Sequence, residues 1–171
     1  MKRRTFLRTT ALATPALLLS AASLRIGLGW WDQRPDRAFL TLSPREVTIC
    51  QAICDALYPG DHLGMPPGLD VGVVEAVDDY LAHIPADTAQ LLRLLLHAID
   101  DFASLATLPP AAFAERSRAQ RQAILRAWDT STFNARQDAF KALKMIFAMG
   151  YCEAPRVLRA AGIDYTCGDW Q

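Results

Sequence analysis

Apolar residues recur at helical spacing along most of the chain after residue 42, and no run alternates as a half-buried strand does. The first helix is predicted to begin at Ser43, which can cap it. Pro44 suits the first turn, and Glu46 can reach back to the N–H of the cap. The helix should run to residue 57, where a dense run of proline and glycine stops it. Its predicted inner face consists of Val47, Cys50, Ile53, Cys54 and Leu57.

Two more helices are predicted over 70–83, ended by Pro85, and over 88–105, with Asp87 and Gln90 as a capping pair. The high apolar content of the segment 88–105 implies a central position in the fold. The buried positions predicted for the segment 70–83 are Val73, Val74, Val77 and Leu81.

Three more helices are predicted. The first begins after Ser117, which pairs with Gln120 as a cap, and the second covers 133–151. The third runs from Pro155 and is ended by Gly162. Their inner positions are Ile124, Leu125, Trp128, Phe140, Leu143, Phe147 and either Met149 or Tyr151. The predicted fold class is therefore all-α, a single-domain bundle of five or six helices. The chain divides into a signal peptide (1–22), a linker (23–42) and the helical domain (43–171).

The stretch "KRRTFLRTTALATPALLLSAASL", residues 2–24, is typical of an export signal, with a basic head, an apolar middle and a small-residue end. Arg3 and Arg4 precede Phe6 and Leu7 at the spacing of a leader for the twin-arginine translocase. That translocase carries folded cargo, often with a bound cofactor. Cleavage is predicted after Ala22. A Sec signal or an uncleaved amphipathic anchor is the alternative interpretation.

Composition fits one exported domain with a single core. About 150 residues remain after the predicted cleavage, which is enough for such a core. The whole chain has 18 basic and 18 acidic residues, and the leader removes four of the basic ones, so the mature net charge is −4. A mildly acidic domain argues against nucleic-acid binding, which needs a concentrated basic face.

Residue spacing gives no catalytic or metal-binding motif. The chain has no CxxCH run for haem, and its glycines are not spaced as in a phosphate-binding loop. His83 is interpreted as a helix-end residue and His97 as a polar position on an apolar helix. The adjacent pairs at 78–79 and 100–101 are interpreted as solvated aspartates. Asp61 and His62 are the one candidate for an unrecognised site.

The four cysteines fall into two pairs. Cys50 and Cys54, one helical turn apart on an apolar stripe, are predicted to be small buried hydrophobes. Cys152 and Cys167 flank the last short helix, so an oxidising compartment would favour a disulfide between them. A bond from one of these two to a partner chain is the alternative.

One segment carries a family resemblance. The stretch "LSPREVTICQAICDALYPGD…GMPPGLDVGVVEAVDDYLA", over 42–82, resembles subunit 3 of bacterial gluconate 2-dehydrogenase-type complexes. The shared pattern is a helix ending in a Pro-Gly-Asp turn, a loop rich in glycine and proline, and a helix that opens Gly-Val-Val. The matching positions are Tyr58, Pro59, Asp61, Gly72, Val73, Val74 and Asp78.

This resemblance implies a non-catalytic role for the chain. In such complexes a large flavoprotein of the glucose–methanol–choline type, which holds FAD, oxidises a sugar, sugar acid or other alcohol. A multihaem cytochrome c subunit often passes the electrons to the membrane quinone pool. The small subunit supplies the twin-arginine leader for the folded flavoprotein. The expected location is the periplasm, with membrane association through the complex, and this chain is expected to bind no cofactor itself.

Two segments are candidates for the surface that docks a partner. The loop "YPGDHLGMPPGLD" is stiffened by its prolines, and the C-terminal "GIDYTCGDWQ" offers aromatic side chains. Both can equally pack on the domain's own core. The candidate interface residues are Tyr58, Pro59, Asp61, His62, Met65, Leu69, Tyr165 and Trp170. The competing hypothesis is a self-standing exported helical enzyme or ligand-binding protein, with a site near Asp61 and His62.

Overall fold

Two helices begin where the capping signals predicted. Ser43 caps α2 (Pro44–Leu57): its hydroxyl accepts from the N–H of Glu46, whose carboxylate accepts from the N–H of Ser43. Ser117 and Gln120 make the same reciprocal pair at the start of α5 (Arg118–Asp129). Each pair satisfies backbone N–H groups that have no partner within the helix.

The computed structural model describes residues 34–60, 63–105 and 111–163, which all fall in one unit, 34–171. Besides α2 and α5, the helices are α3 (Val73–His83), α4 (Ala86–Leu105), α6 (Asn134–Cys152) and α7 (Pro155–Ala160). Short 3-10 turns cover Gly68–Val71 and Phe113–Glu115. None of the described residues forms a strand, and the all-α prediction is confirmed.

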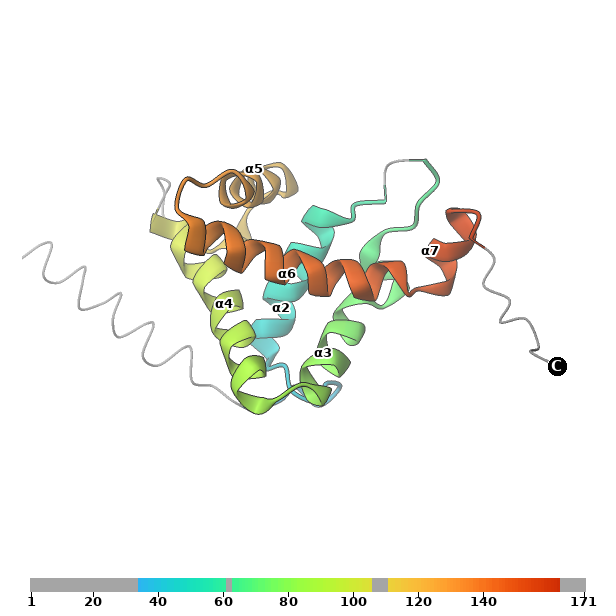
Figure 1. Ribbon diagram of the computed structural model, residues 1–171, viewed down its shortest axis with the longest axis horizontal. Helices are drawn as coiled ribbons and strands as arrows, with labels where there is room; N and C mark the ends of the chain where they lie inside the picture. The colour runs from blue at the N-terminus through green and yellow to red at the C-terminus, as the bar shows by residue number, and fades with distance from the viewer. Residues whose placement is uncertain (1–33, 61–62, 106–110, 164–171) are drawn as a thin grey trace, which may run out of the picture. The chain divides into compact units, whose positions relative to one another are not determined.

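Helix α2 is the centre of the bundle. It packs against α3, α4, α5 and both 3-10 turns, while α6 crosses α3, α4 and α5. Figure 1 shows α3 and α4 on either side of α2, and α6 running across in front of them. The largest fully buried side chains include Ile49, Ile53, Leu96, Ile99, Phe113 and Phe147.

The predicted central position of residues 88–105 is wrong. Helix α4 buries Leu96 and Ile99, but it leaves Leu91 67% and Phe102 46% exposed. Its apolar residues are spread over an inner and an outer face, so high apolar content did not mean full burial. The capping pair predicted for this helix is also wrong, since α4 already begins at residue 86 and Asp87 lies in its first turn.

The helix predicted over 70–83 is divided in two. Gly72 adopts φ +77, a left-handed conformation that ends the first 3-10 turn, and α3 starts at the next residue. An α-helix cannot continue through such a residue. Of the two candidates on the inner face of α6, Tyr151 is buried and Met149 is 41% exposed.

Candidate functional site

A buried carboxylate joins the start of α2 to α4. The Glu46 side chain is 1% exposed, and Arg93 donates to both of its oxygens, at 2.8 and 3.0 Å. His97 Nε2 lies 3.2 Å from Glu46 Oε1. Burial alone would raise the pKa of Glu46, but the hydrogen bonds from His97, Arg93 and Ser43 lower it to about 2. Glu46 is therefore a permanent anion that holds two helices together, not a base poised for proton transfer.

A second carboxylate holds the segment that leads into α2. Asp78 on α3 accepts from the backbone N–H groups of Leu40, Thr41 and Leu42, at 2.6 to 2.9 Å. The hydroxyl of Thr41 donates to the same carboxylate at 2.7 Å. These bonds outweigh the effect of burial and keep the pKa of Asp78 below its ordinary value. The role of Asp78 is thus to fix the entry of the chain into the domain.

The solvated-face interpretation is wrong for one member of each aspartate pair. Asp78 and Asp100 are each 3% exposed. Asp100 accepts from Arg45 at 3.0 Å and from the N–H of Ala114 at 3.1 Å, while Asp101 accepts from Arg45 at 2.9 Å. His97 is likewise buried, at 1% exposure. All these partners lie far away along the chain, so local spacing carried no signal of them.

The loop after α2 is held at both ends. The ring of Tyr58 stacks on that of Tyr151 of α6, with centroids 4.1 Å apart and planes 9° apart. The Tyr151 hydroxyl donates to the carbonyl of Pro66 at 2.8 Å, and the N–H of Gly68 donates to the carbonyl of Tyr58 at 2.9 Å. At Gly68 an added Cβ would lie 2.6 Å from the Cys54 sulfur, so only glycine fits there. Tyr58, which was predicted to be an interface residue, therefore has a structural role in holding the loop.

The tip of this loop presents one leucine to solvent. Leu63 is 97% exposed and has φ +57, a left-handed conformation that is unusual for a bulky side chain. Leu69 is 46% exposed, while Pro59 and Met65 are half-buried. Leu63 was not among the predicted interface residues. The signal for it is a large apolar residue inside a segment of glycines, prolines and charged residues.

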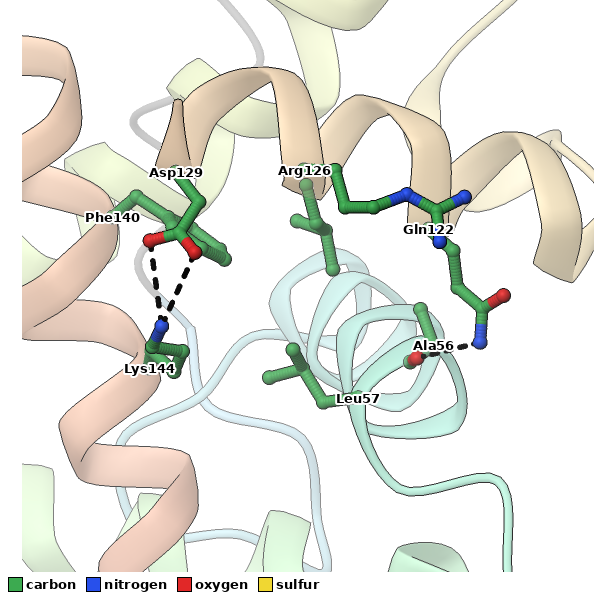
Figure 2. Close-up of a pocket in the computed structure, with 8 residues that line it drawn as sticks. Ala56, Leu57, Gln122, Arg126, Asp129, Phe140 and Lys144 are labelled. Carbon is green, nitrogen blue, oxygen red and sulfur yellow. Dashed lines mark hydrogen bonds and ion pairs between the residues drawn. The ribbon is translucent and has the colours of Figure 1, made fainter. Parts of the chain in front are cut away.

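A pocket of about 370 Å³ opens where α2 ends against α5 and α6. Figure 2 shows Asp129 and Lys144 paired on one side, 3.4 Å apart, and Arg126 and Gln122 on the other. The Gln122 amide donates to the carbonyl of Ala56 at 3.1 Å. The remaining lining residues are Leu57, Leu125 and Phe140. None of the lining residues is a serine, cysteine or histidine, and its charged groups are Arg126 and the paired Asp129 and Lys144.

A second pocket, of about 380 Å³, is almost wholly apolar. It lies between α4, the end of α5 and the start of α6, and includes Phe102, Trp128 and the 68% exposed Phe133. The guanidinium of Arg136 stacks over Trp128, 4.7 Å from the ring centroid. The predictions from sequence did not include this pocket, because its residues come from three helices.

The buried cysteines have no reactive character. Cys50 and Cys54 are free, fully buried thiols, which confirms their predicted role as small hydrophobes. Burial raises the pKa of Cys50 well above its usual range and that of Cys54 to about 12. Both therefore stay protonated at neutral pH. Cys152 is exposed and free.

Several predicted functional residues lie outside the described residues and stay predictions. They are Arg3, Arg4, Phe6, Leu7, Ala22, Asp61, His62, Tyr165, Cys167 and Trp170. Within 34–60, 63–105 and 111–163, no three His, Cys, Asp or Glu side chains stand close enough to hold a metal ion. Over the same ranges, no helix has the length and apolar character needed to cross a membrane.

The described residues form an all-α domain. Its buried carboxylates accept hydrogen bonds from other parts of the same chain. Its surface has an apolar loop tip and two pockets. The model of one protein family, gluconate 2-dehydrogenase subunit 3, matches residues 44–167, well over half of the chain. The chain belongs to this family, and it is therefore a subunit of a dehydrogenase complex. Neither a curated protein nor a solved structure matches it.

Proposed function

We propose that this chain is the non-catalytic small subunit of a periplasmic, flavin-dependent dehydrogenase complex. Its partner is a large flavoprotein of the glucose–methanol–choline type that oxidises a sugar, a sugar acid or another alcohol. The chain escorts this folded flavoprotein through the twin-arginine translocase and stabilises it afterwards. The observation that carries the proposal is a subunit 3 match over 44–167 behind a leader with Arg3 and Arg4.

The division of labour follows from what the described residues do. Glu46, Asp78 and Asp100 accept hydrogen bonds from groups of this chain, and none of them lines either of the two pockets. We therefore assign the oxidation to FAD in the partner, with a multihaem cytochrome c as the third subunit where one is present. The complex also accounts for membrane association of the chain.

The loop 58–68 supports docking of such a partner. Its two ends are fixed by the Tyr58–Tyr151 stack and by the bond from Tyr151 to Pro66, so both ends are in position before binding. A pre-organised loop loses little conformational entropy when a partner binds. Leu63 of this loop is apolar and 97% exposed, so the matching surface on the flavoprotein is an apolar socket that accepts it.

The export role is tested by replacing both Arg3 and Arg4 with lysine in the native producer. We expect both this chain and the flavoprotein to disappear from the periplasm, together with the periplasmic dye-reducing dehydrogenase activity. The matched control is Arg8→Lys, which changes a basic residue of the leader outside the pair and should leave export intact. A flavoprotein that reaches the periplasm equally well with the doubly substituted leader would contradict the escort role.

A further inference from the structure

The apolar pocket between α4, the end of α5 and the start of α6 includes a cationic side chain. Of the described residues that line it, only Arg136 carries a charge, and the others are leucine, alanine, phenylalanine and tryptophan. Phe102 and Phe133 are 46% and 68% exposed, so two aromatic rings of the lining are open to solvent. A ligand that covers these rings removes apolar surface from water, which is favourable.

The side chain of Arg136 leaves a hydrogen-bond donor unused. Its guanidinium lies over the ring of Trp128, 4.7 Å from the centroid. Its Nε is buried and has no hydrogen-bond partner among the described residues. A buried donor without an acceptor is destabilising. An anion bound beside Arg136 would supply both an acceptor and the opposite charge.

The start of α6 adds to the positive potential at this pocket. Ala135 and Arg136, both in the lining, lie in the first turn of the helix. Phe133 provides no side-chain cap, and the first turn contains no acidic residue. A helix N-terminus carries a partial positive charge, so a basic residue there is unfavourable for the helix alone. The arrangement becomes favourable when an anion binds beside it.

The pocket is separate from the loop that we assign to flavoprotein docking. Helices α4, α5 and α6 meet at the end of the bundle away from α7 (Figure 1). Ala135 in the pocket and Tyr151, which holds the loop, lie about 24 Å apart along the axis of α6. A ligand in the pocket therefore leaves the loop free.

We propose that this pocket binds a free monocarboxylate with an unbranched apolar chain of medium length, such as octanoate. The carboxylate pairs with the Arg136 guanidinium, whose parallel N–H groups match its two oxygens, and the chain lies against Phe102 and Phe133. The volume of about 380 Å³ is near the lower end of the range for ligand sites, roughly 300–1,000 Å³, which suits a chain shorter than that of a membrane lipid. A sugar acid has the same carboxylate, but its hydroxyl groups would lose water without gaining partners in an apolar lining.

The test is isothermal titration calorimetry of the purified full chain with octanoate, below the concentration at which it forms micelles. We expect octanoate to bind about tenfold more tightly than octanol, which lacks the charge, and gluconate not to bind. Hexanoate should bind about tenfold more weakly than octanoate, because two fewer methylene groups are buried. Equal affinity for octanoate and octanol, or binding of gluconate, would overturn the proposal. So would binding of phosphatidylglycerol vesicles without binding of octanoate, which would identify a membrane surface as the ligand.

Two variants separate the charged part of the site from its apolar part. Arg136→Gln should remove the preference for octanoate over octanol and leave octanol binding unchanged. Ala139→Leu, which fills the pocket, should weaken both ligands to a similar extent. The matched control is Arg126→Gln, which removes an exposed cation from the lining of the other pocket and should change neither affinity.

Melting temperatures establish that each variant is folded. Unchanged octanoate affinity in folded Arg136→Gln would contradict the assignment of the carboxylate site. Because the isolated chain is used, none of these results depends on whether a flavoprotein is escorted.

Discussion

Glu46 shows how single residues in this domain gain their roles from distant partners. Its bond to Ser43 was predicted from a three-residue spacing, because a capping box is local. Its bonds to Arg93 and His97 join residues about 50 positions apart, and no pattern along the chain indicated them. The same holds for Asp78 and Asp100, which were predicted to be solvated and are buried. A buried charge can be recognised only when its partners are known.

Removal of the Glu46 charge should destabilise the domain strongly. Glu46→Gln leaves Arg93 without its carboxylate, and breaking one side of a buried ion pair costs about 3 kcal/mol. The measurement is the free energy of urea unfolding at pH 7. The matched control is Asp129→Asn, whose partner Lys144 is half-exposed, so the cost should be about 1 kcal/mol or less. Equal effects of the two substitutions would contradict the assignment.

The same residue predicts a pH dependence. The pKa of Glu46 is about 2 in the folded domain and ordinarily 4.5, so its contribution is complete above pH 4.5 and is lost as the pH falls toward 2. Asp78, whose pKa is also lowered, contributes in the same direction. Unfolding free energies measured between pH 7 and pH 2.5 should fall less steeply in Glu46→Gln than in the unchanged chain. Parallel curves would exclude Glu46 as the titrating group.

At the scale of elements, local signals were sufficient for most helix boundaries. Caps at Ser43 and Ser117 and the terminator at Gly162 gave the starts of α2 and α5 and the end of α7. The break at Gly72 was missed because a left-handed glycine within an apolar run has no distinctive neighbours. The exposure of Leu63 was missed although a large apolar residue among glycines, prolines and charged residues is a signal for it.

The loop tip gives a prediction in which stability and binding move in opposite directions. Leu63→Gly relieves a left-handed backbone that costs a leucine about 1–2 kcal/mol, partly offset by the freer unfolded chain. The melting temperature should therefore stay unchanged or rise. Flavoprotein affinity should fall about 30-fold, as for loss of an interface anchor of about 2 kcal/mol.

The control for this loop variant is Leu91→Ala, which truncates another exposed leucine, 67% exposed, on α4. It should leave flavoprotein affinity unchanged. If Leu63→Gly also binds with full affinity, the loop tip is not the docking anchor.

At the scale of the whole molecule, the class of the fold was predictable and its arrangement was not. Helical periodicity and the absence of alternation led to an all-α bundle, which the structure confirms. Helix α4 has two apolar faces, one in the core and one at the surface. Periodicity alone does not say which face is buried, so it did not identify the central helix. The resemblance over 42–82 led to the correct family, because a Pro-Gly loop between two helices is a local pattern.

On the proposed function, the molecule works as part of a larger flavin enzyme. The most direct measurement is affinity purification of the tagged chain from periplasm and membranes, followed by subunit mass analysis and a visible absorption spectrum. We expect one large partner in equal amount with flavin absorbance, and haem bands where a cytochrome subunit is present. A chain that elutes alone and colourless from cells that express it fully would contradict the claim.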